Sequence, residues 1–407
     1  MLYAISQREK PVKSFDKLRT SSAQSFGSAQ DNSKLLSKKR QAAAQTERWT
    51  SITFLMPAVL ALLFLSIFPL IASFYLSLTR FKFARGGFDL EFIGLTNYRQ
   101  LLAGNEQARF LGVLASMTPW HWLIFGLIVF ALILFLVQYY RRAAVTLTGV
   151  LGRITFVVGF SALAWLLLRT LSPGGRLGSL PITLVFVFAG IMIQYVLGLA
   201  LALLTSQDLK GRRFFRVVFL LPMMITPVGV AYMFRMITDT GKGPLVPLWL
   251  GLGLAGLSWV NDPWGARLAI ILADTWQWVP FMFIVLLAAL ESQRIDVMEA
   301  AIVDGANPWQ IFRHITWPAI LPLSLTLILI RMIEAFKIID LPNVMTNGGP
   351  GTATESLTLH AFISWRSLDL GNSAAIAYML LFVVTFFAVA FVNLIRQRVV
   401  ENYKAAA

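Results

Sequence analysis

The sequence predicts an all-α integral membrane protein with about eight transmembrane helices. Of its 407 residues, 57% are hydrophobic and only 14% are charged, whereas a soluble domain has about half apolar and about a quarter charged residues. The mean hydropathy is +0.69. The apolar residues gather in runs of about 20, which is the length of helix that crosses a bilayer.

The predicted spans follow one another along the whole chain. They lie at about 51–79, 120–140, 149–170, 181–205, 214–237, 268–290, 316–339 and 373–395. An even number of spans places both termini on one side. Lys and Arg are more numerous on the segments that this topology puts inside, above all in the N-terminal tail, so both termini are predicted to be cytoplasmic.

Residues 1–48 are predicted to be a disordered basic cytoplasmic tail, because they are rich in Ser, Gln, Lys and Arg. They lack the apolar central region of a signal peptide. The net charge of +15 does not indicate nucleic acid binding, because the charges lie in this tail and in turns between apolar runs. The chain has no cysteine, which excludes disulfides, thiolate metal sites and cysteine nucleophiles.

A polar loop at 291–315 separates two long apolar runs, so it must lie at a membrane face. Asp296, with Glu299 three residues later, predicts a capped short helix over about 297–304. Gly305 supplies the left-handed residue that ends it, and Asn307 and Pro308 begin another helix. An apolar strip remains on this loop and predicts a binding partner; it comprises Ala300, Ala301, Ile302, Phe312 and Ile315.

The run 268–290 carries polar and aromatic side chains on one helical face. Asp274, Gln277, Trp278 and Phe281 recur at steps of three, four and seven residues. A carboxylate and an amide beside aromatic rings can bind the hydroxyl groups of a sugar and stack on its apolar face. The alternative is that the rings are packing or interfacial residues.

Four charges of alternating sign follow in and after the next span: Arg331, Glu334, Lys337 and Asp340. At steps of three they cannot all face one cavity, but neighbours can pair. Arg331 and Glu334 lie deeper, whereas Lys337 and Asp340 are expected to be structural or interfacial. Ionisable groups inside a membrane indicate functional sites.

The 291–315 loop resembles the coupling loop of permease subunits of bacterial ABC importers, which docks on a separate ATPase. The residues that carry this resemblance are Glu299, Ala300, Ala301, Asp304, Gly305, Ala306, Ile315, Pro318 and Pro322. Two further stretches, FIGLTNYRQLL at 92–102 and TNGGPG at 346–351 followed by Glu355-Ser356-Leu357, resemble the longer permease of sugar importers.

This resemblance implies a six-helix permease core, into which 112–180 is inserted as an additional two-span hairpin. The first core span and an outer segment would occupy 49–111, and the remaining core, with the coupling loop, would occupy 181–400. The hairpin is nearly all aliphatic between its aromatic and basic ends, so we expect it at the lipid-facing periphery.

The resemblance to maltose-type permeases also implies a substrate pathway. The corresponding positions are Met223, Pro227, Gln277, Trp278, Phe281, Arg331, Glu334, Ala335 and Ile338. The expected partners are a second permease subunit, an ATPase dimer that binds ATP-Mg, an extracytoplasmic solute-binding protein and a small polar solute. No cofactor is expected in this chain, which would lie in a bacterial or archaeal inner membrane.

Other chemistry finds little support in the sequence. There is no Walker A motif, and Gly251, Gly253 and Gly256 form a Gly-x-Gly-x-x-Gly string that follows no strand. His121, His314 and His360 are far apart, and each is expected to be a polar surface or interface residue. The favoured solute is a sugar or oligosaccharide, with glycerol 3-phosphate as an alternative because Arg prefers phosphate. An ion-coupled secondary transporter is the alternative from another class.

Overall fold

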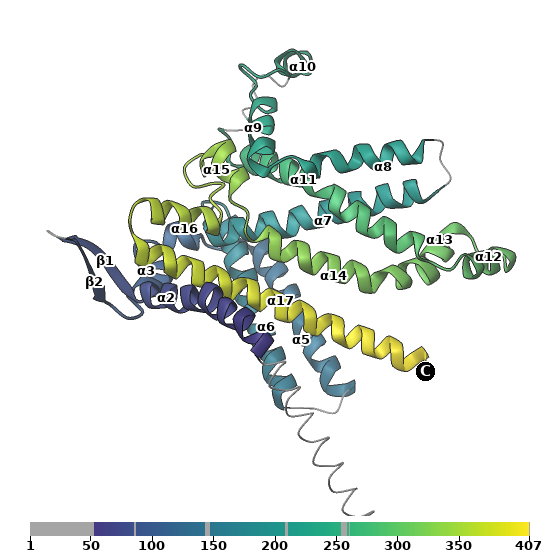
Figure 1. Cartoon of the computed structure of the whole chain (residues 1–407), viewed down its shortest axis with the longest axis horizontal. Coiled ribbons are helices and arrows are strands. Elements are labelled where there is room, and N and C mark those ends of the chain that lie inside the picture. The colour runs from purple at the N-terminus through teal and green to yellow at the C-terminus, as the bar shows by residue number, and fades with distance from the viewer. Residues whose placement is uncertain are drawn as a thin grey trace, which may run out of the picture. The chain divides into compact units, whose positions relative to one another are not determined.

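The computed structural model describes residues 53–84, 87–142, 147–207, 211–253, 259 and 261–406 (Figure 1). The predicted tail, 1–48, lies outside these residues. The chain divides between Ala72 and Ser73 into two compact units. The first span is a helix over Thr53–Ser77, which includes a π-helical turn, η1 (Leu63–Ile67), and α2 (Phe68–Ser77).

Seven helices are long and apolar enough to cross a membrane, or up to eight if a bent pair counts as one span. This confirms the predicted all-α membrane fold of about eight spans. The spans are Thr53–Ser77, Pro119–Gln138, Gly152–Leu171, Ser179–Ser206, Pro263–Glu291, Pro308–Ala335 and Leu370–Asn393.

A two-stranded ribbon follows the first span and was not predicted. β1 (Thr79–Ala84) pairs antiparallel with β2 (Gly87–Phe92), and Phe81 stacks on Phe88 at 5.6 Å between ring centroids. Polar and apolar residues alternate along both strands, as in a ribbon with two unlike faces.

The next helix, α3 (Thr96–Ala103), is fastened to the end of the first span. Asn97 Nδ2 donates to the carbonyl oxygens of Ser77 and Thr79 at 2.8 and 3.0 Å, and Tyr98 is hydrogen-bonded to Ser77 Oγ at 2.8 Å. These bonds satisfy carbonyl groups that the end of a helix leaves free. The Asn-Tyr pair thus has a structural role.

The segment predicted as an insertion begins and ends at one place. After α4 (Gln107–Phe110), strand β3 (Gly112–Val113) pairs antiparallel with β4 (Arg176–Leu177). Between the two strands lie α5 (Pro119–Arg142) and α6 (Leu147–Leu171). The most apolar window of α5 has no buried residue, whereas α6 stacks Phe156 on Phe386 at 6.3 Å. The place of this hairpin in the lipid remains a prediction.

The core is built from α7 (Ser179–Ser206), α11 (Pro263–Glu291), α14 (Trp317–Ala335) and α17 (Leu370–Ala406). α7 runs along α11, and α14 contacts both (Figure 1). Of these spans, α11 is the most buried. Apolar side chains from all four helices form the main cluster, which includes Val187, Leu286, Leu327 and Ile376.

The span predicted at 214–237 is not one helix. α8 (Arg212–Leu220) and a short 3₁₀ turn, η2 (Leu221–Met224), are separated from α9 (Pro227–Ile237) by a bend of 97°. Pro227 stands at the first position of α9 and Thr226 accepts a hydrogen bond from the N–H of Gly229, so the sequence starts a new helix here. Hydropathy alone cannot detect this, because the residues are apolar on both sides of the bend.

Four short helices complete the described part of this region: α10 (Val246–Gly251), α12 (Ile295–Val303), α15 (Asp340–Thr346) and α16 (Leu357–Arg366). The predicted span 316–339 is displaced: α13 (Pro308–Ile311), the π-helical turn η3 (Phe312–Thr316) and α14 form one helix that stops at Ala335. Asp340 therefore belongs to α15. That helix ends at Asn347, which is left-handed, as the predicted TNGGPG turn requires.

Candidate functional site

The 291–315 loop has the predicted order of helix, glycine turn and helix. Gly305 has a φ of 83°, and the N–H groups of Gly305 and Ala306 donate to the carbonyls of Ile302 and Ala301 at 3.0 and 2.9 Å. This pair of bonds is a Schellman motif. Asn307 and Gln310 then form a reciprocal capping box at the start of α13.

One part of the loop prediction was wrong. α12 begins at Ile295, two residues before the expected position, and its N-cap residue is Arg294 without a side-chain cap. Asp296 lies in the first turn, where its negative charge interacts favourably with the positive end of the helix dipole. Its carboxylate also contacts Arg294 at 3.4 Å.

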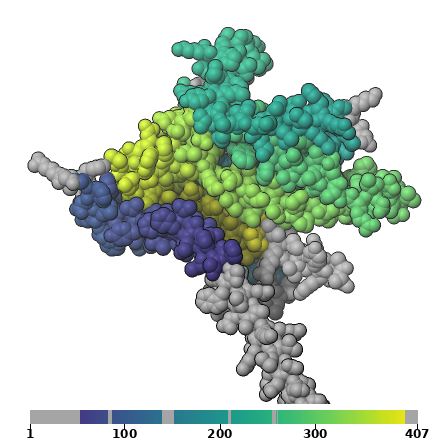
Figure 2. Space-filling model, viewed as in Figure 1, coloured from purple at the N-terminus to yellow at the C-terminus, as the bar shows by residue number. Residues whose placement is uncertain are grey.

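The loop carries large apolar side chains that no described residue covers. Val303 is 86% exposed, Trp309 65% and Ile302 62%. Figure 2 shows the loop protruding beyond the helices that flank it. Phe312 and Ile315, also predicted for the apolar strip, are half-buried. Exposed apolar side chains on a protruding loop mark a surface that binds a partner.

The other residues predicted for this loop also lie at the surface. Glu299, Ala300, Asp304 and Gly305 are exposed, Ala301 and Ala306 are half-exposed, and Pro318 and Pro322 are exposed on the first turns of α14. None of them packs into the core. Their part in ATPase binding remains a prediction.

A buried polar network lies far from this loop, between three core helices. Arg331 on α14 donates through Nη2 to Asp274 on α11 at 2.6 Å and through Nε to Gln194 on α7 at 2.9 Å. Gln194 Nε2 donates to the same Asp274 oxygen at 2.8 Å. We call these three residues the Arg331 network. The three side chains satisfy one another's hydrogen-bonding groups. A charged group in a low-dielectric interior requires such partners.

Aromatic and amide groups extend this network toward the broken span. The Arg331 guanidinium carbon lies 4.5 Å from the ring centroid of Trp278, a cation–π contact. Trp278 meets Phe281 edge to face at 6.0 Å. Gln277 Nε2 donates to the carbonyl of Ile225 at 3.2 Å, and Ile225 is one of the two residues between η2 and α9. Gln277 thereby satisfies a carbonyl that the break sets free.

The structure thus gathers part of the predicted substrate pathway. Arg331 contacts Asp274 and Trp278, and Trp278 contacts Phe281. Gln277, on the same helix, bonds separately to the break that Met223 and Pro227 flank. Glu334, near the end of α14, instead pairs with Lys337, which follows that helix, at 2.9 Å, and both side chains are exposed. Ala335 is buried in the core and Ile338 is half-buried beside a second apolar cluster. Gln194 was not predicted, although it is the only amide in the apolar run 179–206.

The break itself is exposed. Met223, Met224 and Ile225 are 46%, 79% and 41% exposed. Tyr232 and Met236 continue this exposed side along α9. Non-helical backbone at membrane depth cannot face lipid, because its polar groups would lack partners there. At that depth, the break would have to face protein or a water-filled path.

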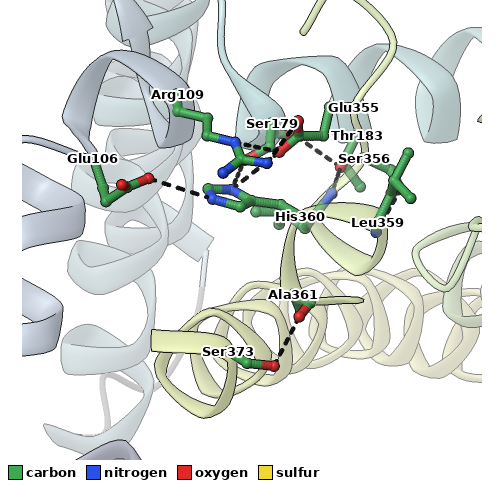
Figure 3. Close-up of polar contacts among 11 residues, drawn as sticks. Glu106, Arg109, Ser179, Thr183, Glu355, Ser356, Leu359, His360, Ala361 and Ser373 are labelled. Carbon is green, nitrogen blue, oxygen red and sulfur yellow. Dashed lines mark hydrogen bonds and ion pairs between the residues drawn. The ribbon is translucent and has the colours of Figure 1, made fainter. Parts of the chain in front are cut away.

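A second buried cluster, missed in the sequence, lies at the other end of the core (Figure 3). Arg109 on α4 holds both oxygens of Glu355 at 2.9 and 3.1 Å, and His360 Nδ1 is hydrogen-bonded to Ser179 Oγ at 2.9 Å. His360 Nε2 lies 3.7 Å from an oxygen of Glu106. His360 is fully buried, so the prediction of a surface or interface histidine was wrong for it.

Burial governs the protonation of this cluster. Loss of solvent, with a smaller contribution from the Arg109 charge, lowers the pKa of His360 to about 3, so the imidazole is neutral. Burial raises the pKa of Glu355, and the bond from Arg109 opposes that shift. Within the described ranges, no three His, Asp or Glu side chains come together as a metal site.

Comparison with known proteins assigns the chain. Residues 194–401, about half of the chain, match the family described as binding-protein-dependent transport system inner membrane component. The trehalose/maltose transport system permease protein MalF of Thermococcus litoralis is 32% identical over 231 residues, which are 57% of this chain and 78% of that protein. The probable ABC transporter permease protein y4oQ of Sinorhizobium fredii is 26% identical over 331 residues, 81% of this chain and 84% of that protein.

A solved structure supports the fold. It is the crystal structure of a bacterial ABC transporter involved in the import of the acidic polysaccharide alginate, one chain of which matches with a TM-score of 0.55 at 17% identity, over 88% of this chain and 99% of that one. At this identity the likeness concerns the fold alone. The chain therefore belongs to the family of binding-protein-dependent transport system inner membrane components: it is a multi-pass, non-catalytic permease subunit of an ABC importer, and ATP is hydrolysed by a separate chain.

Proposed function

We propose that this permease carries a sugar or oligosaccharide across the inner membrane. The observation that carries the proposal is the exposed break between η2 and α9, which is contacted by the side chain of Gln277, the residue before Trp278. An amide at an exposed break, with an aromatic ring on the next residue of α11, suits a solute with hydroxyl groups and an apolar face. A relative named for trehalose and maltose transport supports the same class of solute.

The pairing of Arg331 and Lys337, the two cations that could suit a phosphate, favours an uncharged solute over glycerol 3-phosphate. Arg331 is 1% exposed and bonded to Asp274 and Gln194, and Lys337 is paired with Glu334. Arg331 is thus too buried to reach a phosphate group, and Lys337 already has an anionic partner. An ion-coupled secondary transporter is not supported, because the chain belongs to a family of ABC importers.

Two exposed surfaces, the 291–315 loop and one side of α8 and α9, support the proposed partners. The 291–315 loop, with Val303, Ile302 and Trp309 exposed, would bind the ATPase dimer in the cytoplasm, where both termini would also lie. The exposed side of α8 and α9 would face a second permease subunit across the solute path. A binding protein outside would deliver the solute, as the description of the family implies. Closure of the ATPases would then switch the permease between two access states.

Reconstitution tests this proposal. The complex is purified through a tag on this chain and inserted into proteoliposomes with its binding protein. We expect ATP-driven uptake of labelled trehalose or maltose that unlabelled sugar, but not glycerol 3-phosphate, competes away. Uptake of glycerol 3-phosphate alone would contradict the sugar assignment.

A paired substitution tests the docking surface separately. Val303→Glu places a charge on the most exposed apolar residue of the loop and should remove the ATPase from the purified complex. Leu248→Glu, on exposed residue Leu248 of α10, is the matched control and should retain it. Retention of the ATPase by both variants would show that the loop is not the docking site.

A further inference from the structure

The two helices that flank the 291–315 loop are joined again deep inside the protein. Asp274 lies 17 residues before Glu291, the last residue of α11, or about 25 Å along the helix. Arg331 lies 15 residues after Thr316, or about 22 Å along α14. The loop connects the helices at one end and the 2.6 Å ion pair connects them at the other.

α7 is tied into the same assembly by two side chains in succession. Gln194 closes the ring with Asp274 and Arg331, and Tyr195 Oη donates to Ser324 of α14 at 2.9 Å. α7 also packs closely on α11: a Cβ at Gly198 would lie 2.5 Å from Met282 Cβ. Three helices from distant parts of the chain are therefore fastened by directional bonds as well as by apolar packing.

The Arg331 network resists separation. Arg331, Asp274 and Gln194 are all buried, and Trp278 covers one face of the guanidinium. Sliding α14 against α11 by one helical turn would leave a charge without a partner in an interior that cannot solvate it. Only movements that keep the three helices together avoid this penalty.

One helical turn after Asp274, α11 also contacts the proposed solute path. Gln277 follows Asp274 on α11 and holds the Ile225 carbonyl at the break of the neighbouring span. A displacement of α11 therefore reaches the break directly. α8 is attached to the same helix near the loop, since Arg216 contacts Glu291.

We propose that Gln194, Asp274 and Arg331 are positioning residues that make α7, α11 and α14 move as one body. A displacement imposed at the 291–315 loop is then delivered to the break between η2 and α9 instead of being lost in sliding between helices. This inference rests on the proposed function, because it assigns the network a part in coupling ATP hydrolysis to solute movement.

The test uses the reconstituted complex and measures solute imported per ATP hydrolysed. Asp274→Leu with Arg331→Met removes both charges together, which leaves no unpaired ion and allows folding. We expect this variant to assemble and hydrolyse ATP while its import per ATP falls at least tenfold. The double variant Gln194→Glu with Asp274→Asn moves the carboxylate from α11 to α7. Its side chains can form the same ring of bonds with Arg331, so it should keep the wild-type ratio of solute imported to ATP hydrolysed.

Two further variants keep the outcome interpretable. Lys337→Gln breaks an exposed ion pair at the C-terminal end of α14 and should leave the ratio unchanged. Gln194→Leu keeps the ion pair and removes only the hydrogen bonds to α7. This variant should lower the ratio at least threefold, and it provides the test if the apolar double variant does not assemble. A wild-type ratio in the apolar double variant, or in Gln194→Leu, would overturn the inference. Failure of the sugar proposal is distinct, since the wild-type complex would then import no sugar.

Discussion

The guanidinium of Arg109 donates two hydrogen bonds to the carboxylate of Glu355, at 2.9 and 3.1 Å, across a separation of 246 residues. Arg109 precedes the inserted hairpin and Glu355 precedes α16, so this pair fastens the region before the insertion to the end of the core. Glu355 is buried, and its charge has no other cation within reach among the salt bridges of the described residues.

Substitution of Arg109 by Met should therefore destabilise the protein by about 3 kcal/mol at pH 7.5, because it leaves a buried carboxylate unpaired. Denaturant titration of the purified protein in detergent measures this. Arg109→Lys keeps the charge but not the two-bond geometry and should cost less. Equal stability of wild type and Arg109→Met would mean that the pair contributes nothing.

His360 should make stability depend on pH. Its folded pKa of about 3 lies below the ordinary value of 6.5, so below pH 6.5 the unfolded chain binds a proton that the folded protein does not. The contribution of His360 to the free energy of unfolding is therefore nearly complete above pH 6.5, and it is lost as the pH decreases from there toward 3. Between pH 7.5 and 5.5 the loss is about 1.4 kcal/mol.

The control for this prediction is His360→Gln, which cannot titrate and can still bond Ser179. Its stability should change less than that of the wild type over the same pH interval. Glu355 titrates in the opposite sense, since burial raises its pKa, but it is present in both proteins. Parallel stability curves for the two proteins would refute the role of His360.

Gly371 tests the close approach of α17 to the start of β1. A Cβ at Gly371 would lie 2.1 Å from the carbonyl oxygen of Thr79 and 3.0 Å from Asn97 Nδ2. Gly371→Ala must therefore displace the Asn97 bonds, and we expect a loss of about 1–3 kcal/mol in a denaturant titration.

Gly126→Ala on α5 is the matched control, because its Cβ would meet nothing within 4 Å. Alanine should stabilise that helix by up to about 1 kcal/mol. If both alanine variants change stability alike, the contact at Gly371 is not tight.

The sequence predicted the features that depend on local chemistry. The spans follow from runs of apolar residues, and the turn at Gly305 and the start at Asn307 follow from capping preferences. The early start of α12 was missed because Arg294 begins that helix without a side-chain cap, so no capping residue marks it.

Features that depend on contacts between distant segments could not be predicted in the same way. Nothing local tells which helix Gln194 faces, although a single amide in an apolar run was a signal that it has a partner. Arg109 and Glu355 are 246 residues apart, on opposite sides of the insertion, so no local pattern marks their contact. The bend at Thr226 and Pro227 did carry a local signal, a cap followed by proline, which the continuous hydropathy concealed.

The last prediction concerns Gly305, which the exposed loop holds at a φ of 83° with open space where a Cβ would be. Backbone conformation, not packing, is therefore what this position requires. Asn adopts the left-handed conformation readily, whereas a β-branched residue does not. A β-branched residue costs about 1–2 kcal/mol there, which shifts the population of the Schellman turn by about a factor of ten.

We therefore expect Gly305→Asn to retain ATP-driven uptake and Gly305→Val to lose at least nine-tenths of it, both measured in proteoliposomes. The global stability of both variants should match that of the wild type, because the turn at 302–305 is exposed and its loss is local. Loss of uptake without loss of stability would assign the effect to the shape of the loop. Full uptake by Gly305→Val would mean that the turn can change shape without harm, and that the ATPase recognises the exposed side chains of the loop independently of its fold.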